Sequence, residues 1–172
     1  MKVAANARSI SLKLERKAMS LVSRSKIYME MMKTYKKYGA SDIVIHISKD
    51  LERVKKVAER LLWLSRVLEW IALRAETLAI AGFAYQNLAN IVGVLREIKK
   101  DIICTIPEIS IMINEVEKPL EKACSYVIFD VEGSTSTLFT PSKEALEILK
   151  KAEEIAKSRL EESLKGESLK SS

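Results

Sequence analysis

Large apolar residues recur with a helical period near the start of the chain. Their separations of 4, 7, 7, 4 and 3 residues place them on one side of a helix. They are Ile10, Leu14, Leu21, Tyr28, Met32 and Tyr35. A second stretch, from residue 43 to 78, advances more regularly by threes and fours, as the a/d seam of a coiled coil does. Its members are Ile43, Ile47, Leu51, Val54, Ala58, Leu61, Ser65, Leu68, Ala72, Ala75 and Leu78. The pattern predicts two long helices, each about 45 to 55 Å in length.

A single glycine separates these two helices. Gly39 is the only glycine or proline among the first 81 residues, and lysines precede it. Glycine suits the left-handed C′ position that ends a helix, and lysines interact favourably with the dipole of the last turn. Ser41 or Asp42 is then expected to cap the following helix. Because the connection is so short, the two helices are predicted to form an antiparallel hairpin.

The next part of the chain predicts shorter helices. Residues 77–95 carry no charge, so a membrane-spanning helix has to be weighed. Gln86 and two asparagines argue against spanning and favour a helix buried on most sides. Its one-sided pattern consists of Ala84, Leu88, Ile91, Leu95, Ile98 and Ile102. A further helix is expected to open at Pro107 and to be disturbed at Pro119. Its apolar positions are Ile106, Ile109, Ile113, Val116 and Leu120.

A polar segment precedes one last helix. Residues 126–141 are rich in Ser and Thr and predict a linker, and Thr140 with Pro141 predicts the start of the helix. One face of that helix carries Ala145, Leu149, Ala152, Ile155, Ala156 and Leu160. An amphipathic helix on a tether must bury this face, either on its own hairpin or on a neighbour's.

These patterns predict an all-α fold, a long antiparallel helical hairpin (coiled-coil-like) with shorter helices and a tethered C-terminal amphipathic helix. The five glycines and three prolines among 172 residues agree with a mostly helical chain. The predicted organisation is a helical core over 1–125, with the hairpin at about 7–80 and the shorter helices at about 82–125, then a linker over 126–141, a C-terminal helix over 142–165 and a tail over 166–172.

Charge is distributed unevenly along the chain. The net charge is +6, but residues 1–41 carry +8, residues 42–100 carry +3, residues 101–142 carry −5 and residues 143–172 carry none. A basic first helix followed by an acidic middle suggests an anionic partner for the first helix, or a fold in which the two regions attract each other.

The cations of the first helix lie off its apolar side. They include Lys13, Arg16, Lys17, Arg24, Lys26, Lys33 and Lys37. Only Glu15 and Glu30 offset the first helix's ten Lys and Arg, whereas solvated helix faces usually mix the two signs. The second helix carries a further basic stripe at spacings of four, three and four residues, which is either part of the same surface or an ordinary coiled-coil flank. This stripe consists of Lys49, Arg53, Lys56 and Arg60.

Residues for catalysis or cofactor binding are scarce. His46 is the only histidine, which excludes Ser-His and Cys-His nucleophiles and the di-metal sites of helical bundles. Cys104 and Cys124 are too few for a zinc site, and they are predicted to be buried thiols or, alternatively, a single disulfide. We expect no enzyme activity, no metal and no cofactor.

Several segments now support a resemblance to a known family. They are WIALRAETL at 70–78, LREIKKDIICTIPEISIMINEV at 95–116 and EALEILKKAEEIAKSRLEESL at 144–164. Their order, together with the basic hairpin and the terminal helix, resembles the ESCRT-III family and, within it, the archaeal Cdv (CdvB-like) cell-division paralogs. The likeness spans nearly the whole chain and depends on the order of elements more than on one diagnostic motif.

The resemblance implies a cytoplasmic protein that is peripheral on the inner face of the cell membrane and polymerises there. The implied partners are anionic membrane, other copies of the chain and related ESCRT-III paralogs. A further implied partner is an AAA ATPase that carries MIT domains and grips the C-terminal tail. The resemblance implies membrane contact through Lys13, Arg16, Lys17, Arg24, Lys26, Lys33, Lys49, Arg53, Lys56 and Arg60. It also implies that Leu149, Ala152, Ile155, Ala156 and Leu160 pack across a neighbouring subunit's hairpin.

The tail departs from the family pattern. Glu153, Arg159 and Leu160 match one motif that MIT domains bind, but Ala156 and Ser163 stand where leucines are expected. No proline follows Pro141, so the proline-rich alternative is missing as well. The interaction with the ATPase is therefore expected to be weak, indirect or made otherwise.

Two other functions are weighed against this one. A basic hairpin also binds nucleic acid through phosphates, although Tyr28 and Tyr35 lie on the apolar side, away from the cations beside which bases would stack. A plain coiled-coil scaffold would leave the basic first helix and the tethered last helix unexplained. Membrane remodelling, as in cell division or vesicle budding, is the leading hypothesis.

Overall fold

The structure, a computed structural model, describes five helices and confirms the all-α fold. They are α1 (Lys2–Lys37), α2 (Ser41–Ala81), α3 (Tyr85–Ile103), α4 (Pro107–Ile128) and α5 (Lys143–Lys165). The turn at 38–40 is also described, whereas residues 1, 82–84, 104–106, 129–142 and 166–172, with some side chains near helix ends, are not. Most of the predicted linker and all of the predicted tail therefore lie outside the described residues. No described segment is a β-strand.

The described helices divide into two compact units. The hairpin unit comprises residues 12–65 with the C-terminal part from residue 153, and the other unit comprises residues 1–11 and 66–152. The boundaries between the units fall inside α1, α2 and α5.

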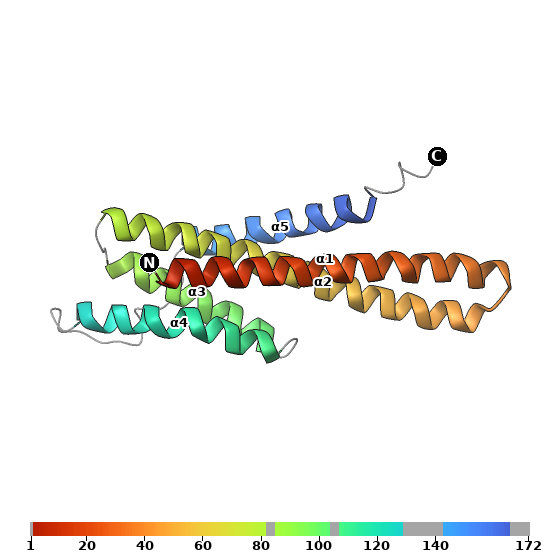
Figure 1. Ribbon diagram of the computed structural model, residues 1–172, viewed down its shortest axis with the longest axis horizontal. Coiled ribbons are helices and arrows are strands. Elements are labelled where there is room, and N and C mark those ends of the chain that lie inside the picture. Colours follow the sequence, from red (N-terminus) through yellow and green to blue (C-terminus); the bar gives the residue numbers. More distant parts are fainter. Residues whose placement is uncertain (1, 82–84, 104–106, 129–142, 166–172) are drawn as a thin grey trace. The chain divides into compact units, whose positions relative to one another are not determined.

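The hairpin unit turns at Gly39, as the sequence predicts (Figure 1). Gly39 has φ of 71°, in the left-handed region, and its N–H donates to the Lys36 carbonyl at 3.3 Å. The Ala40 N–H donates to the Tyr35 carbonyl at 3.1 Å, which completes a Schellman motif. Nothing lies within 4 Å of the position that a Cβ on Gly39 would occupy, so the backbone conformation rather than space requires glycine.

The expected cap of α2 is wrong by one or two positions. The Ala40 carbonyl accepts the first helical hydrogen bond, from the Val44 N–H at 3.2 Å, so Ala40 holds the N-cap position. Ser41 and Asp42 lie in the first turn, where the Asp42 carboxylate still faces the positive end of the helix dipole. Ala40 therefore both completes the Schellman motif of α1 and caps α2, so no further residue separates the two helices.

Small residues contribute much of the hairpin core. Ala18 and Ser25, seven residues apart on α1, and Ala58 of α2 are fully buried. The Ser25 hydroxyl donates to the Leu21 carbonyl of its own helix at 3.0 Å, so its burial leaves no polar group unsatisfied. The large residues Leu14, Val22, Leu51, Leu61, Leu62 and Leu64 are also buried. In the first helix the predicted seam residues Tyr28, Met32 and Tyr35 are only half-buried.

In the second helix the predicted seam is confirmed from Leu51 to Ala72, but its first member is wrong. Ile43 is 44% exposed, and the half-buried Val44 takes the position toward the core. Val44 stands seven residues before Leu51, so it keeps the heptad spacing that Ile43 does not.

In the other unit, α3 and α4 lie side by side (Figure 1). The predicted apolar positions whose side chains are described are buried on both helices, whereas the side chains of Ala84, Leu88, Ile102 and Ile106 lie outside the described residues. The buried positions are Ile91, Leu95 and Ile98 on α3 and Ile109, Ile113, Val116 and Leu120 on α4. Pro107 is the first residue of α4, as predicted, and α4 continues through Pro119 to Ile128. The uncharged run at 77–95 is divided between α2 and α3.

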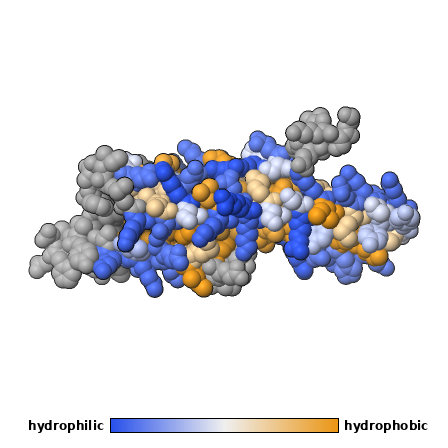
Figure 2. Space-filling model, viewed as in Figure 1, coloured by the Kyte–Doolittle hydropathy of each residue, from blue (hydrophilic) through white to orange (hydrophobic). Residues whose placement is uncertain are grey.

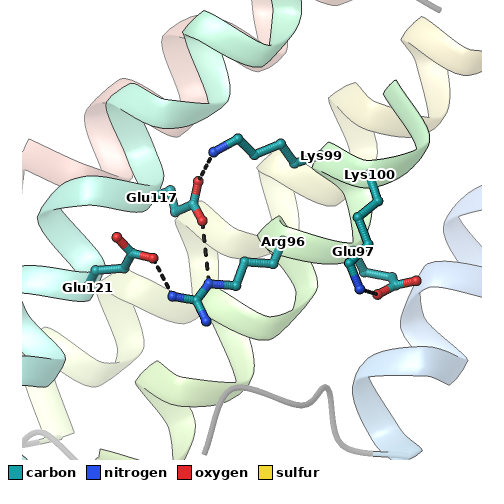
Figure 3. A network of polar contacts seen from close by, with 6 residues as sticks. All are labelled: Arg96, Glu97, Lys99, Lys100, Glu117 and Glu121. Carbon is teal, nitrogen blue, oxygen red and sulfur yellow. Dashed lines mark hydrogen bonds and ion pairs between the residues drawn. The ribbon is translucent and has the colours of Figure 1, made fainter. Parts of the chain in front are cut away.

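Ion pairs join α3 to α4 around one buried carboxylate (Figure 3). The side chain of Glu117 is only 7% exposed, and its two oxygens meet Lys99 Nζ at 2.9 Å and Arg96 Nε at 3.6 Å. Arg96 also donates to Glu121 at 2.7 Å. Two acidic residues of α4 therefore meet two cations of α3, which aligns the pair of helices.

Within the described part of the chain, no helix combines the length and the hydropathy that crossing a bilayer requires.

Candidate functional site

Four cations form the α1 basic face, defined by Lys13, Arg16, Lys17 and Arg24. All four side chains are exposed, and all belong to the hairpin unit. Lys13, Arg16 and Arg24 form no ion pair with any residue that the structure describes. Their charges are therefore available to an anionic partner, because no neighbouring carboxylate offsets them.

The α2 basic stripe, Lys49, Arg53, Lys56 and Arg60, is exposed but differs in its surroundings. Arg53 pairs with Asp50 at 3.5 Å, and Lys56 pairs with Glu52 at 2.9 Å. The Lys56 hydrogen bond lowers the pKa of Glu52. Arg60 lies over the ring of Trp63, 5.7 Å from its centroid. Acidic neighbours on the same helix thus offset part of the stripe's charge.

The remaining two predicted contacts, Lys26 and Lys33, lie apart from the α1 basic face. Lys26 is half-buried and Lys33 is exposed, and both are more than 100° around α1 from Lys13 by the helical period. Lys33 lines an open apolar groove of about 490 Å³ near the hairpin turn. The groove is lined by Met29, Met32, Lys33, Lys36, Gly39, Ser41, Val44 and Leu51. Sequence reasoning missed this groove; the methionines at 29 and 32 were its only signal.

The second half of α5 folds back on its own chain's hairpin. Within the hairpin unit Ala156 and Leu160 are buried, and Arg159 forms an ion pair with Glu15 of α1. Lys157 lies 3.0 Å from Glu153 and 3.9 Å from Glu59 of α2, and its hydrogen bond to Glu153 raises the pKa of Lys157. The sequence leaves two arrangements open for this helix, packing on its own hairpin or on a neighbour's. The structure shows the second half of α5 on its own hairpin, which we call the closed arrangement.

The predicted apolar face of α5 is mostly confirmed. Ala145 and Ala152 are buried, and Leu149 is half-buried. Ile155 was placed on this face wrongly, because it is 53% exposed and lies at the edge of the stripe. Ile155 follows Ala152 by three residues, whereas Ala156 follows it by four and takes the inward position.

Helical periodicity places α5 and the α1 basic face on different flanks of α1. Glu15, which pairs with Arg159, lies about 180° to 200° around the helix from Lys13, Lys17 and Arg24. The second half of α5 therefore covers the flank away from these three cations.

The candidate ATPase-binding residues contact or pack against other residues of the same chain in this arrangement. Glu153 pairs with Lys157, Arg159 pairs with Glu15, and Leu160 is 7% exposed. An external partner reaches Leu160 only after this part of α5 leaves the hairpin.

The described residues offer little for catalysis. His46 is exposed rather than packed in the core, and no cluster of three or more His, Cys, Asp or Glu side chains in the described part of the chain could hold a metal ion. Cys104 and the side chain of Cys124 lie outside the described residues, so the prediction for these thiols stays a prediction.

Comparison with known proteins finds a similar archaeal protein. The chain is 29% identical over 154 residues to Cell division protein B1 of Sulfolobus acidocaldarius. The alignment covers 83% of this chain and 72% of that protein. No protein-family model matches the sequence, and no solved structure matches it. The similarity confirms the predicted resemblance to the archaeal cell-division proteins.

Proposed function

We propose that this protein is a non-enzymatic subunit of a membrane-remodelling filament, resembling ESCRT-III, that acts in membrane scission such as archaeal cell division. The observation that carries the proposal is the α1 basic face, which is exposed and has three of its cations, Lys13, Lys17 and Arg24, on the flank away from the second half of α5. The similarity to Cell division protein B1 supports the cellular process.

The α1 basic face supplies the attraction to an anionic bilayer. Each Lys or Arg held near such a surface contributes about 1 kcal/mol, so four cations contribute about 4 kcal/mol, or roughly a thousandfold in partitioning. The α2 basic stripe contributes less per residue, because Asp50 and Glu52 pair with two of its cations. Avidity along a polymer then multiplies the affinity of a single subunit.

The hairpin also offers a place for a neighbour's terminal helix. By the helical period, Met29 and Lys33 lie on the same flank of α1 as Glu15, which α5 of the same chain contacts. The groove therefore continues this flank toward the turn. A neighbour's α5 that presents Ala156 and Leu160 there would link subunits, and release of the chain's own α5 would expose the same residues to an MIT-domain ATPase.

Liposome sedimentation tests the membrane proposal. Reversal of the four cations, Lys13→Glu, Arg16→Glu, Lys17→Glu and Arg24→Glu, is expected to abolish binding to vesicles that contain anionic lipid at low salt. The matched variant reverses the four cations of the α2 basic stripe and is expected to bind more weakly than the wild type but measurably. Equal binding by the wild type and the first variant would exclude the α1 basic face as the membrane contact.

The same preparation tests the alternative function. Negative-stain microscopy is expected to show filaments on anionic vesicles and none on neutral vesicles. A protein that ignores vesicles and instead retards DNA or RNA in a gel would favour the nucleic-acid hypothesis, since basic helices attract either polyanion.

A further inference from the structure

Exposed apolar side chains gather near the turn of the hairpin. The end cluster consists of Ile27, Met31, Tyr38, Ile43 and Ile45. Their exposed fractions are 57%, 38%, 81%, 44% and 53%. These five residues are half of the ten large exposed hydrophobic residues in the described part of the chain, yet they fall within 19 positions. Figure 2 shows hydrophobic surface among hydrophilic surface at this end of the hairpin.

Part of the end cluster continues the α1 basic face. Met31 follows Lys13 by eighteen residues, which is five full helical turns, and Ile27 lies within about 40° of the same line. A surface that contacts a bilayer through Lys13 and Arg24 therefore brings Ile27 and Met31 to the same bilayer.

The end cluster carries the charges that suit an anionic interface. Residues 27–45 contain three lysines and two acidic residues, Glu30 and Asp42. By the helical period Lys33, Lys36 and Lys37 lie about 120° to 160° around α1 from Met31, so these lysines flank the face that carries Met31. Tyr38 combines an apolar ring with a hydroxyl, the combination enriched where membrane meets water.

Part of the backbone of the turn is paired within the turn itself. The N–H groups of residues 38, 39, 40 and 41 all donate to backbone carbonyls, over 3.0 to 3.3 Å. A loop that leaves water without such partners would lose several kcal/mol for each unsatisfied group, which keeps most loops out of lipid. These four donors therefore keep their hydrogen bonds when the turn leaves the aqueous phase.

We propose that three members of the end cluster, Ile27, Met31 and Tyr38, insert into the interfacial layer of an anionic bilayer, below the phosphates that the α1 basic face contacts. This inference rests on the proposed membrane function and adds an apolar contact to it. It assigns specificity to membranes with loosely packed headgroups, because amphipathic insertion depends on access to the acyl boundary. It also makes part of the binding resistant to salt, since burial of apolar surface is not screened.

Fluorescence from a probe at the turn tests the insertion. A Tyr38→Cys variant, in a chain with Cys104→Ser and Cys124→Ser, carries an environment-sensitive dye and is mixed with vesicles of phosphatidylserine and phosphatidylcholine. The matched control carries the dye at Leu12→Cys, which is 54% exposed and lies about 100° around α1 from Lys13. Sedimentation of the same samples reports binding independently.

The expected result is a blue shift at position 38 with quenching by lipids brominated on their acyl chains, and neither effect at position 12. Sedimentation without these effects would overturn the insertion and leave the membrane function standing. Absence of sedimentation would overturn both. A blue shift without vesicles would show that another copy of the chain covers the cluster and would also overturn the insertion.

A second variant avoids the dye. Replacement of three members of the cluster, Ile27→Gln, Met31→Gln and Tyr38→Ser, is expected to weaken partitioning about tenfold or more and to remove the binding that persists at high salt. Leu12→Gln is the matched control and is expected to bind as the wild type does. Equal salt profiles for the triple variant and the wild type would contradict the insertion.

Discussion

Replacement of the buried Glu117 tests whether ion pairs hold α3 against α4. The Glu117 side chain is 7% exposed and meets Lys99 Nζ at 2.9 Å and Arg96 Nε at 3.6 Å (Figure 3). Glu117→Gln keeps the size of the side chain and removes its charge. The two cations then keep one neutral acceptor in place of a carboxylate, and Arg96 still has Glu121 at 2.7 Å.

The magnitude follows from the exposure of the partners. Breaking a fully buried ion pair costs about 3 to 5 kcal/mol, whereas exposed pairs contribute about 0 to 1 kcal/mol. Here the carboxylate is buried, but Lys99 is 29% exposed and Arg96 is 43% exposed, so water partly solvates both cations after the change. The expected loss is about 1.5 kcal/mol, which corresponds to roughly a tenfold easier opening of the helix pair.

Amide hydrogen exchange measures this local opening directly. Protection of residues 109–120 in α4 is expected to fall about tenfold in Glu117→Gln. Glu115→Gln is the matched control, because Glu115 is exposed on the same helix and forms no ion pair with any described residue. An equal fall in both variants, or none in Glu117→Gln, would refute the assignment of the buried carboxylate as the link between α3 and α4.

Two further predictions concern the hairpin unit. Gly39→Ala is expected to lower the free energy of unfolding by about 1 kcal/mol, because φ of 71° strains any residue with a Cβ, and Gly39→Asn is expected to lower it less. Urea unfolding measures the stability of both variants. Equal stability of Gly39→Ala and the wild type would refute the strain. Arg159→Glu is expected to speed amide exchange over residues 153–165 several-fold, because the new carboxylate repels Glu15. Adding Glu15→Arg to the same chain is expected to restore protection. Failure of that rescue would show that the ion pair does not hold α5.

The elements of the fold could be predicted because their signals are local. Gly39 predicts the turn because glycine adopts the left-handed conformation without strain, and the Schellman motif around it involves only neighbouring residues. The heptads of α2 from Leu51 onward are equally visible, since large and small apolar residues keep one spacing. The seam of α1 was harder to see, because Ala18 and Ser25 occupy it and a search for large apolar residues passes over them.

Contacts between helices could not be predicted in the same way. The charge pattern showed that α3 and α4 differ in sign, but not that Glu117 would be buried between two cations. The α1 basic face was visible as a set of exposed cations, whereas its difference from the α2 basic stripe depends on side-chain pairs such as Lys56 with Glu52. Which flank of α1 receives α5 is likewise a matter of packing, decided by Arg159 and Glu15.

The position of α5 has a consequence for the order of events under the proposed function. Its second half lies on the flank of α1 away from Lys13, Lys17 and Arg24, so a closed subunit already presents these cations to a bilayer. A partner that needs Leu160 must wait until this part of α5 leaves the hairpin. Adsorption to membrane is then governed by screened charge, and release of α5 by burial of Ala156 and Leu160 together with one ion pair. Salt should therefore reverse the first step, whereas Arg159→Glu should promote the second step without weakening the first.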